Sequence, residues 1–274
     1  MAPMSKYEEY SRIIADALDD FKLKEVTEYL VSNSNLPGPR ANLELASAFA
    51  DYFDTWKGND KLLEFLFELA NISSLDAPTD DPREILPFCA VQAFGSLYLK
   101  VDEPQRLQIL DTLKKAMNDR RWRMREAIAM SFQRIAEKDF HVVQELFTSL
   151  YPGSGFLEKR AFIAALAHPP ILKSRENVLF CLKISEDILN EIISLDENQR
   201  KSEEFTVLSK GLEYAISVFV ENLPEEGFDM LKRFAAVGNK DIKRILKSNL
   251  GKARLTKKYG DKVREILEIV ENTK

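Results

Sequence analysis

The feature that most constrains this chain is a helical apolar period that runs through nearly all of its 274 residues. Between residues 60 and 70, and again between 184 and 193, apolar side chains recur at the i, i+3, i+4, i+7 spacing of one helix face. No run of strand length alternates between apolar and polar residues. Ten Gly and 11 Pro are too few for the many tight turns of an all-β fold. The sequence therefore predicts an all-α protein.

Short breaks interrupt this period in a regular rhythm. Segments that start near residues 5, 40, 82, 119, 155, 198 and 239 each hold roughly two helices, about 13–14 helices in total. The spacing of about 35–42 residues is typical of helical-pair solenoids, in which each pair completes its core by stacking on its neighbours. Long linkers are absent, so we expect one α-α superhelix over residues 1–274. A plain helical bundle is the alternative.

Two stretches support the repeat in detail. Residues 119–129 align with 154–164 at an offset of 35 residues, which places Trp122 opposite Leu157. This match predicts that Trp122 packs in the core rather than stacking on a ligand. In the same stretch Arg125 is expected to form a structural ion pair with an Asp rather than to contact a phosphate.

The sequence NDRRWRMREAIAMSFQRIAE, which begins at Asn118, resembles a HEAT repeat. In that pattern an acidic residue at the turn and a following Arg, here Asp119 and Arg125, typically bond between neighbouring units. FLEKRAFIAALAHPPIL and KDIKRILKSNLGKARL resemble further units, so that the resemblance covers about residues 118–258. The chain is similar to HEAT-like proteins placed near the DNA alkylation-repair glycosylases, which implies an α-α superhelix with a concave binding surface.

The resemblance also implies an activity to consider, the release of alkylated bases from DNA. Those glycosylases use a Trp and a nearby Asp beside the lesion, and an Arg from a later W-x-R-R helix. Here Trp122 and Arg125 are present, but Met124 replaces the other Arg. Trp56 and Asp60 have the required mutual spacing. We therefore expect a non-enzymatic binding or scaffold module, with a DNA-binding protein or a glycosylase as the alternative.

Charge is spread unevenly and suggests where a macromolecule could bind. Residues 1–118 hold 12 basic and 20 acidic residues, a net charge of −8, whereas 119–274 hold 27 and 24, a net charge of +3. Residues 230–258 carry ten basic residues against one acid. The candidate phosphate-binding residues are Arg120, Arg121, Arg123, Lys240, Lys243, Arg244, Lys247, Lys252 and Arg254. The alternative is a solvated face that caps a solenoid. In the helix expected to begin near Lys240, the buried side is expected to consist of Ile242, Ile245, Leu246, Asn249 and Leu250.

Other functional classes find little support in the sequence. Cys89 and Cys181 are expected to be buried reduced thiols. No CxxC or HExxH occurs, and no Cys or second His lies near either His in the sequence, so we expect no zinc site. P-loop and GxSxG motifs are absent. We expect no cofactor, no metal and no membrane contact, a cytoplasmic location, and a protein or duplex nucleic acid as the partner. Asp51 and Asp54, near Trp56, are the most plausible carboxylate cluster.

Overall fold

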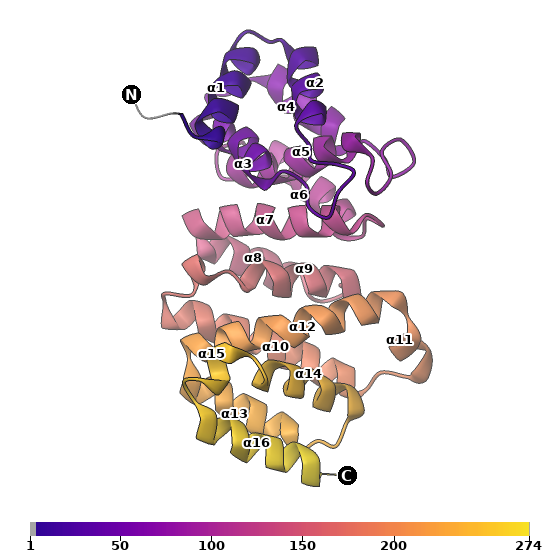
Figure 1. Cartoon of the computed structure of the whole chain (residues 1–274), viewed down its shortest axis with the longest axis vertical. Helices are drawn as coiled ribbons and strands as arrows, with labels where there is room; N and C mark the ends of the chain where they lie inside the picture. Colours follow the sequence, from indigo (N-terminus) through magenta and orange to yellow (C-terminus); the bar gives the residue numbers. More distant parts are fainter. Residues whose placement is uncertain (1–3, 274) are drawn as a thin grey trace. The chain divides into compact units, whose positions relative to one another are not determined.

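A computed structural model describes residues 4–273 of the chain. Over these residues it contains α-helices and short 3-10 turns and no strand (Figure 1). The helices are α1 (Lys6–Asp19), α2 (Leu23–Ser32), α3 (Leu43–Tyr52), α4 (Asp60–Ala70), α5 (Ile85–Leu97), α6 (Glu103–Met117), α7 (Trp122–Lys138), α8 (Phe140–Leu150), α9 (Phe156–Leu166), α10 (Arg175–Ile193), α11 (Glu197–Lys201), α12 (Glu203–Asn222), α13 (Pro224–Ala235), α14 (Lys240–Leu250), α15 (Ala253–Thr256) and α16 (Gly260–Asn272). The prediction of an all-α protein is confirmed.

The helix count exceeds the prediction because two helices are too short to show a period. Helices α11 and α15 have five and four residues.

Sequence features also fix where helices begin. Ser5 caps α1 by accepting a hydrogen bond from the Glu8 amide, while the Glu8 carboxylate accepts one from Ser5 in return. Asp102 and Gln105 form the same reciprocal pair at α6.

The chain divides into two compact units, residues 1–138 and 139–274. The expectation of a single domain stays a prediction, and each unit is described by itself. When the net charge is divided at this boundary, the first unit has 18 basic and 23 acidic residues, and the second has 21 of each. The first unit therefore carries the whole formal charge of −5, and the second is neutral.

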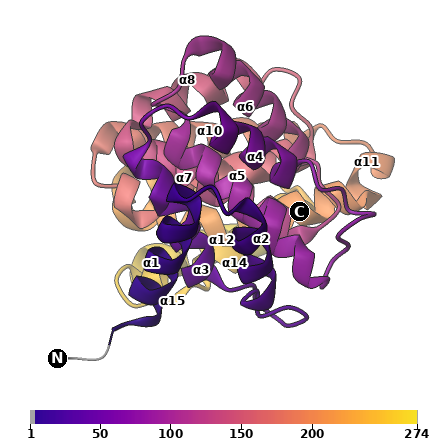
Figure 2. The same ribbon diagram turned by 90° about the horizontal axis from the view of Figure 1, so that it is seen from above.

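In the first unit, helices α1, α3, α5 and α7 pack one against the next and form a row (Figure 1 and Figure 2). Helices α2, α4 and α6 pack against members of this row. The four helices of the row are those that open the segments predicted near residues 5, 40, 82 and 119. Within this unit, each predicted segment therefore begins with one helix of the row.

Helix α5 is the centre of the first unit, because all thirteen of its residues are buried. It also approaches α7 very closely. A Cβ atom added at Gly95 would lie 2.3 Å from the backbone oxygen of Ser131, so only glycine permits this helix crossing. Cys89, on the same helix, is a buried free thiol, as is Cys181 in the second unit. The prediction for both cysteines is confirmed.

The second unit has a corresponding row of α9, α12 and α14, with α10 and α13 packed against it and α16 against α13 and α14. Phe147 of α8 contacts Phe162 of α9, with ring centroids 4.4 Å apart and ring planes tilted by 33°. Asn249 of α14 is fully buried and accepts a hydrogen bond from the Ser217 amide of α12 at 2.7 Å. The predicted buried side of α14 is confirmed at Ile242, Ile245, Leu246, Asn249 and Leu250.

Candidate functional site

Two of the arginines predicted to contact phosphate are buried in the first unit. Arg121 and Arg123 are each 2% exposed, whereas Arg120 lies on the surface. Arg121 pairs with Asp119 at 2.7 Å and donates to the carbonyl oxygens of Ile72 (3.0 Å) and Ala77 (3.1 Å). It thus fixes the loop after α4. A run of charged residues in a sequence does not show whether its side chains reach solvent or bond to neighbouring loops.

Arg123 forms the most deeply buried ion pair of the first unit. Its guanidinium lies 3.0 Å from the Glu84 carboxylate, which is fully buried, and 2.7 Å from Asp80. A third hydrogen bond joins it to the carbonyl oxygen of Gly38. Burial raises the pKa of Glu84, and Arg123 opposes that rise. Arg123 therefore joins the α2–α3 and α4–α5 connections to α7 and is not available to a ligand.

The prediction that Trp122 packs in the core is wrong. Its side chain is 42% exposed, and its ring lies 4.5 Å from the Arg123 guanidinium carbon in a cation–π contact. The neighbouring Arg125 donates to the backbone oxygens of Asp119 (2.9 Å) and Arg120. The Asp119 carboxylate accepts hydrogen bonds from Arg121. The sequence match at an offset of 35 residues aligned the helices correctly but not every side chain.

In the second unit, most of the basic residues predicted to contact phosphate form ion pairs with acidic side chains or hydrogen bonds with backbone carbonyls. Arg244 bonds Glu213 and Asp241, Lys247 lies 3.7 Å from Glu271, and Lys243 donates to the Thr273 carbonyl. Arg254 stacks on Tyr214, with its guanidinium carbon 4.9 Å from the ring, and lies 3.9 Å from Glu221. Lys240 is exposed and Lys252 half-buried. Because the unit has no net charge, this surface is a weaker attractor for phosphate than the residue run alone indicates.

The residues that a base-releasing site requires are not gathered in one cleft. Trp56 lines a cavity of about 700 Å³ between α1, α3 and the start of α4. Asp60 begins α4 outside that lining, and Arg125 lies at the start of α7. Trp56, Asp60 and Arg125 are therefore not brought together in the lining of this cavity.

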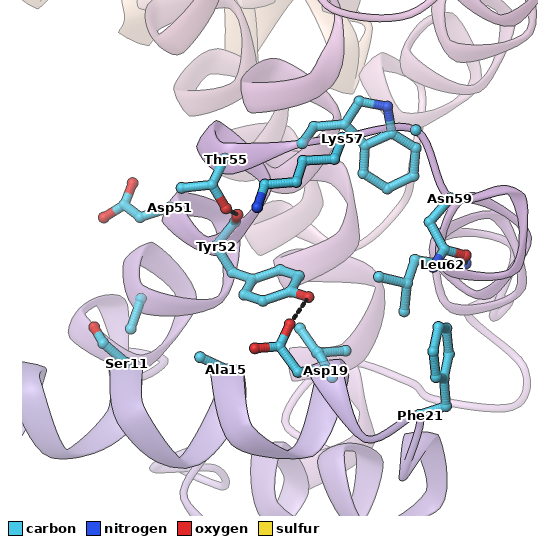
Figure 3. A pocket seen from close by; sticks show the side chains of 14 residues that line it. Ser11, Ala15, Asp19, Phe21, Asp51, Tyr52, Thr55, Lys57, Asn59 and Leu62 are labelled. Carbon is cyan, nitrogen blue, oxygen red and sulfur yellow. Dashed lines mark hydrogen bonds between the residues drawn. The ribbon is translucent and has the colours of Figure 1, made fainter.

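We call this cavity the aromatic cleft (Figure 3). Its lining residues are Ser11, Ala15, Leu18, Asp19, Phe21, Ala48, Asp51, Tyr52, Thr55, Trp56, Lys57, Gly58, Asn59 and Leu62. The Tyr52 hydroxyl donates a 2.7 Å hydrogen bond to Asp19 on α1, which Figure 3 shows across the cleft. Burial and the Asp19 carboxylate both raise the pKa of Tyr52, so this phenol stays protonated near neutral pH. The cleft offers aromatic faces, the carboxylates of Asp19 and Asp51, and the ammonium group of Lys57.

A second cavity of about 540 Å³ opens on the row α1, α3, α5 and α7, and we call it the polar cavity. Its lining residues are Tyr7, Leu43, Glu44, Ser47, Asp51, Gln92, Met130, Gln133, Arg134 and Glu137. All lie in the first unit. The polar cavity and the aromatic cleft share Asp51, which therefore stands at the centre of the candidate site.

Three side chains hold Asp51, one from α1, one from α7 and one from its own helix α3. The Tyr7 hydroxyl and the Arg134 guanidinium bond its two carboxylate oxygens, and Ser47 donates at 3.2 Å. Burial raises the pKa of Asp51, but the hydrogen bonds from Tyr7 and Arg134 outweigh it and hold the pKa below its usual range. Arg134 also bonds Ser47 (3.0 Å) and Ser96 (3.3 Å). Asp51 is therefore a fixed carboxylate rather than a proton donor.

Gln92 is the functional candidate that sequence reasoning missed. It lies on the central helix α5, is among the residues that line the polar cavity, and is only 3% exposed. Its amide nitrogen has no hydrogen-bond partner in the structure. A signal was present, because Gln92 is the only residue with a long polar side chain in the apolar run Ile85–Leu97. Whether its amide is satisfied, however, depends on helices far away in the sequence.

Comparisons with known proteins give no relative, since no family model, curated protein or solved structure matches the chain. Within residues 4–273, no helix is both long and apolar enough to cross a membrane. The same described residues contain no group of three or more His, Cys, Asp or Glu side chains arranged to hold a metal ion. The candidate site therefore rests on the geometry of the first unit.

Proposed function

We propose that this chain is a non-enzymatic HEAT-like repeat module that binds a protein partner through the row α1, α3, α5 and α7. The observation that carries the proposal is the position of Asp51, which lines two adjoining cavities on that row. Repeat proteins bind extended partners along such rows of equivalent helices. The row α9, α12 and α14 of the second unit supports a helical repeat within that unit as well.

Charge favours a protein over duplex nucleic acid as the partner. The row and its cavities lie in the unit that carries the whole net charge of −5. Arg134, which lines the polar cavity, is already engaged by Asp51 and two serines. Phosphate groups need unsatisfied cations, whereas acidic surfaces attract basic protein segments. Duplex DNA bound along Lys240–Arg254 remains the alternative.

The experiment selects binders from a library of random 12-residue peptides displayed on phage, using the immobilised full-length chain. Selected peptides are then tested against Glu44→Lys, which reverses a charge at the polar cavity, and against Glu103→Lys as its matched control. Both residues are exposed and lie in the first turn of a helix, α3 and α6, so each variant carries a similar small cost of a few tenths of a kcal/mol.

Binding that is weakened by Glu44→Lys and kept by Glu103→Lys supports the proposal. Equal binding to both variants would place the partner elsewhere and contradict it. A labelled DNA duplex gives the opposing test. Steeply salt-dependent binding that is lost in Lys243→Glu/Lys247→Glu would transfer the function to the nucleic-acid alternative.

A further inference from the structure

Gln92 presents a buried donor that the folded chain leaves without an acceptor. Its amide nitrogen is buried and has no partner, although the residue lines a cavity. Native proteins pair nearly all buried polar groups, because an unpaired one costs about 1–3 kcal/mol of desolvation. Because Gln92 lines the cavity, a turn of its carboxamide would bring this donor to a group that enters the cavity, such as a carbonyl oxygen.

The charges around Gln92 specify the rest of that group. Three carboxylates, Glu44, Asp51 and Glu137, and one guanidinium, Arg134, line the polar cavity, which gives it a formal charge of −2. Arg134 lies in the ion pair with Asp51, where both side chains are largely shielded from solvent. An anion entering this cavity would meet the excess carboxylates, and a cation is electrostatically complementary to it.

The remaining walls suit a long aliphatic chain. Leu43 and Met130 supply apolar surface beside the carboxylates. Lys and Arg side chains lay their methylene stems on such surface while the charged end bonds acids, and Met adapts its shape to what it contacts. The volume of about 540 Å³ lies within the range of pockets that enclose a small ligand.

We infer that the polar cavity binds an arginine or lysine side chain of the partner, with an adjacent peptide carbonyl accepting a hydrogen bond from the Gln92 amide. This inference rests on the proposed protein-binding function and names the chemistry of its partner. It does not apply to the aromatic cleft, where no buried donor lacks a partner.

The test uses N-acetyl-L-arginine N-methylamide, which carries both the cation and the peptide carbonyls. The full-length chain is labelled with 13C at its methionine methyl groups, of which there are six, and the Met130 signal is assigned with Met130→Leu. We expect a saturable shift of the Met130 signal. N-acetyl-L-norleucine N-methylamide, an uncharged analogue, should bind at least about tenfold more weakly.

Variants separate the two contacts. Gln92→Leu should weaken arginine binding by about tenfold, and Glu44→Gln by a few fold, while Gln108→Leu on the exposed face of α6 should leave it unchanged. Gln92→Leu also tests whether the donor is unsatisfied. Its melting temperature should equal or exceed that of the wild type, because an apolar residue replaces an unpaired amide.

Equal shifts with the arginine and norleucine probes, or no shift at all, would overturn the inference. If peptides from the library bind the row while the arginine probe leaves Met130 unmoved, only this inference fails. If the arginine probe binds but no library peptide does, the cavity is a cation site and the proposed protein-binding function fails instead.

Discussion

Replacing Arg123 should lower the free energy of unfolding of the first unit more than any surface substitution nearby. In Arg123→Ala, the fully buried Glu84 carboxylate keeps only a 3.1 Å hydrogen bond from the Asp80 amide. Its other oxygen has no partner even in the wild type. Breaking a buried ion pair from one side costs about 3–5 kcal/mol, because the remaining charge stays desolvated. That is a large part of the roughly 5–15 kcal/mol that stabilises a typical domain.

Urea unfolding followed by tryptophan fluorescence measures this loss selectively. Both tryptophans, Trp56 and Trp122, lie in the first unit, so their emission reports on residues 1–138 while the full-length chain is used. With a urea slope of about 1–3 kcal/mol per molar, the midpoint should fall by about 1–5 M. Arg83→Ala is the control, because Arg83 pairs with Asp81 at the surface. It should cost less than about 1 kcal/mol.

The pH dependence of the variant tests the cause. Burial holds the pKa of Glu84 above its usual range, so the folded chain binds that proton more tightly than the unfolded chain does. Without Arg123 the pKa rises further, and the free energy of unfolding falls as the pH rises above the usual carboxyl range. The loss relative to wild type should therefore be larger near pH ~7.5 than near pH ~5.

A second variant keeps this reasoning open to refutation. Arg123→Met combined with Glu84→Leu removes both charges from the buried site and should regain much of the lost stability. An Arg123→Ala midpoint within the error of the Arg83→Ala control would refute the argument. So would a loss of stability that is independent of pH.

Two further predictions concern the packing of each unit. Gly95→Ala should lower the free energy of unfolding of the first unit by about 1–3 kcal/mol in the same fluorescence assay, because the new methyl group meets the Ser131 backbone at 2.3 Å; unchanged stability would mean that α5 and α7 can separate freely. Cys89 and Cys181 should react with an aromatic disulfide reagent only in denaturant, since burial raises the pKa of both thiols; rapid labelling of the native chain would contradict their burial.

The fold was predictable from the sequence to the level of helices and their rhythm. The segments expected near residues 5, 40, 82 and 119 begin with α1, α3, α5 and α7, the helices that form the row. Local signals suffice here, because helix caps and apolar periodicity act within a few residues. The short helices α11 and α15 were not predicted, because four or five residues carry no measurable period.

Individual side chains in that rhythm were less predictable. Trp122 aligned with Leu157 and was expected in the core, yet it is exposed and stacks on Arg123. The buried residue is Arg123, whose acidic partners Asp80 and Glu84 lie about 40 residues earlier in the chain. Periodicity gives the direction of a side chain on its own helix. It does not show which loop will cover that side chain, and long-range ion pairs decide this.

The candidate site shows the same limit at its centre. Asp51 could be proposed from sequence because two carboxylates stood near Trp56, but its partners Tyr7 and Arg134 come from helices at opposite ends of the row. Gln92 stands out in sequence only as a polar residue within an apolar helix, which is also what a satisfied core amide looks like. The distinction is made by the cavity beside it. The proposed binding function therefore rests on a hydrogen bond that folding leaves unmade, and Gln92→Leu is the substitution in which folding and binding should respond in opposite directions.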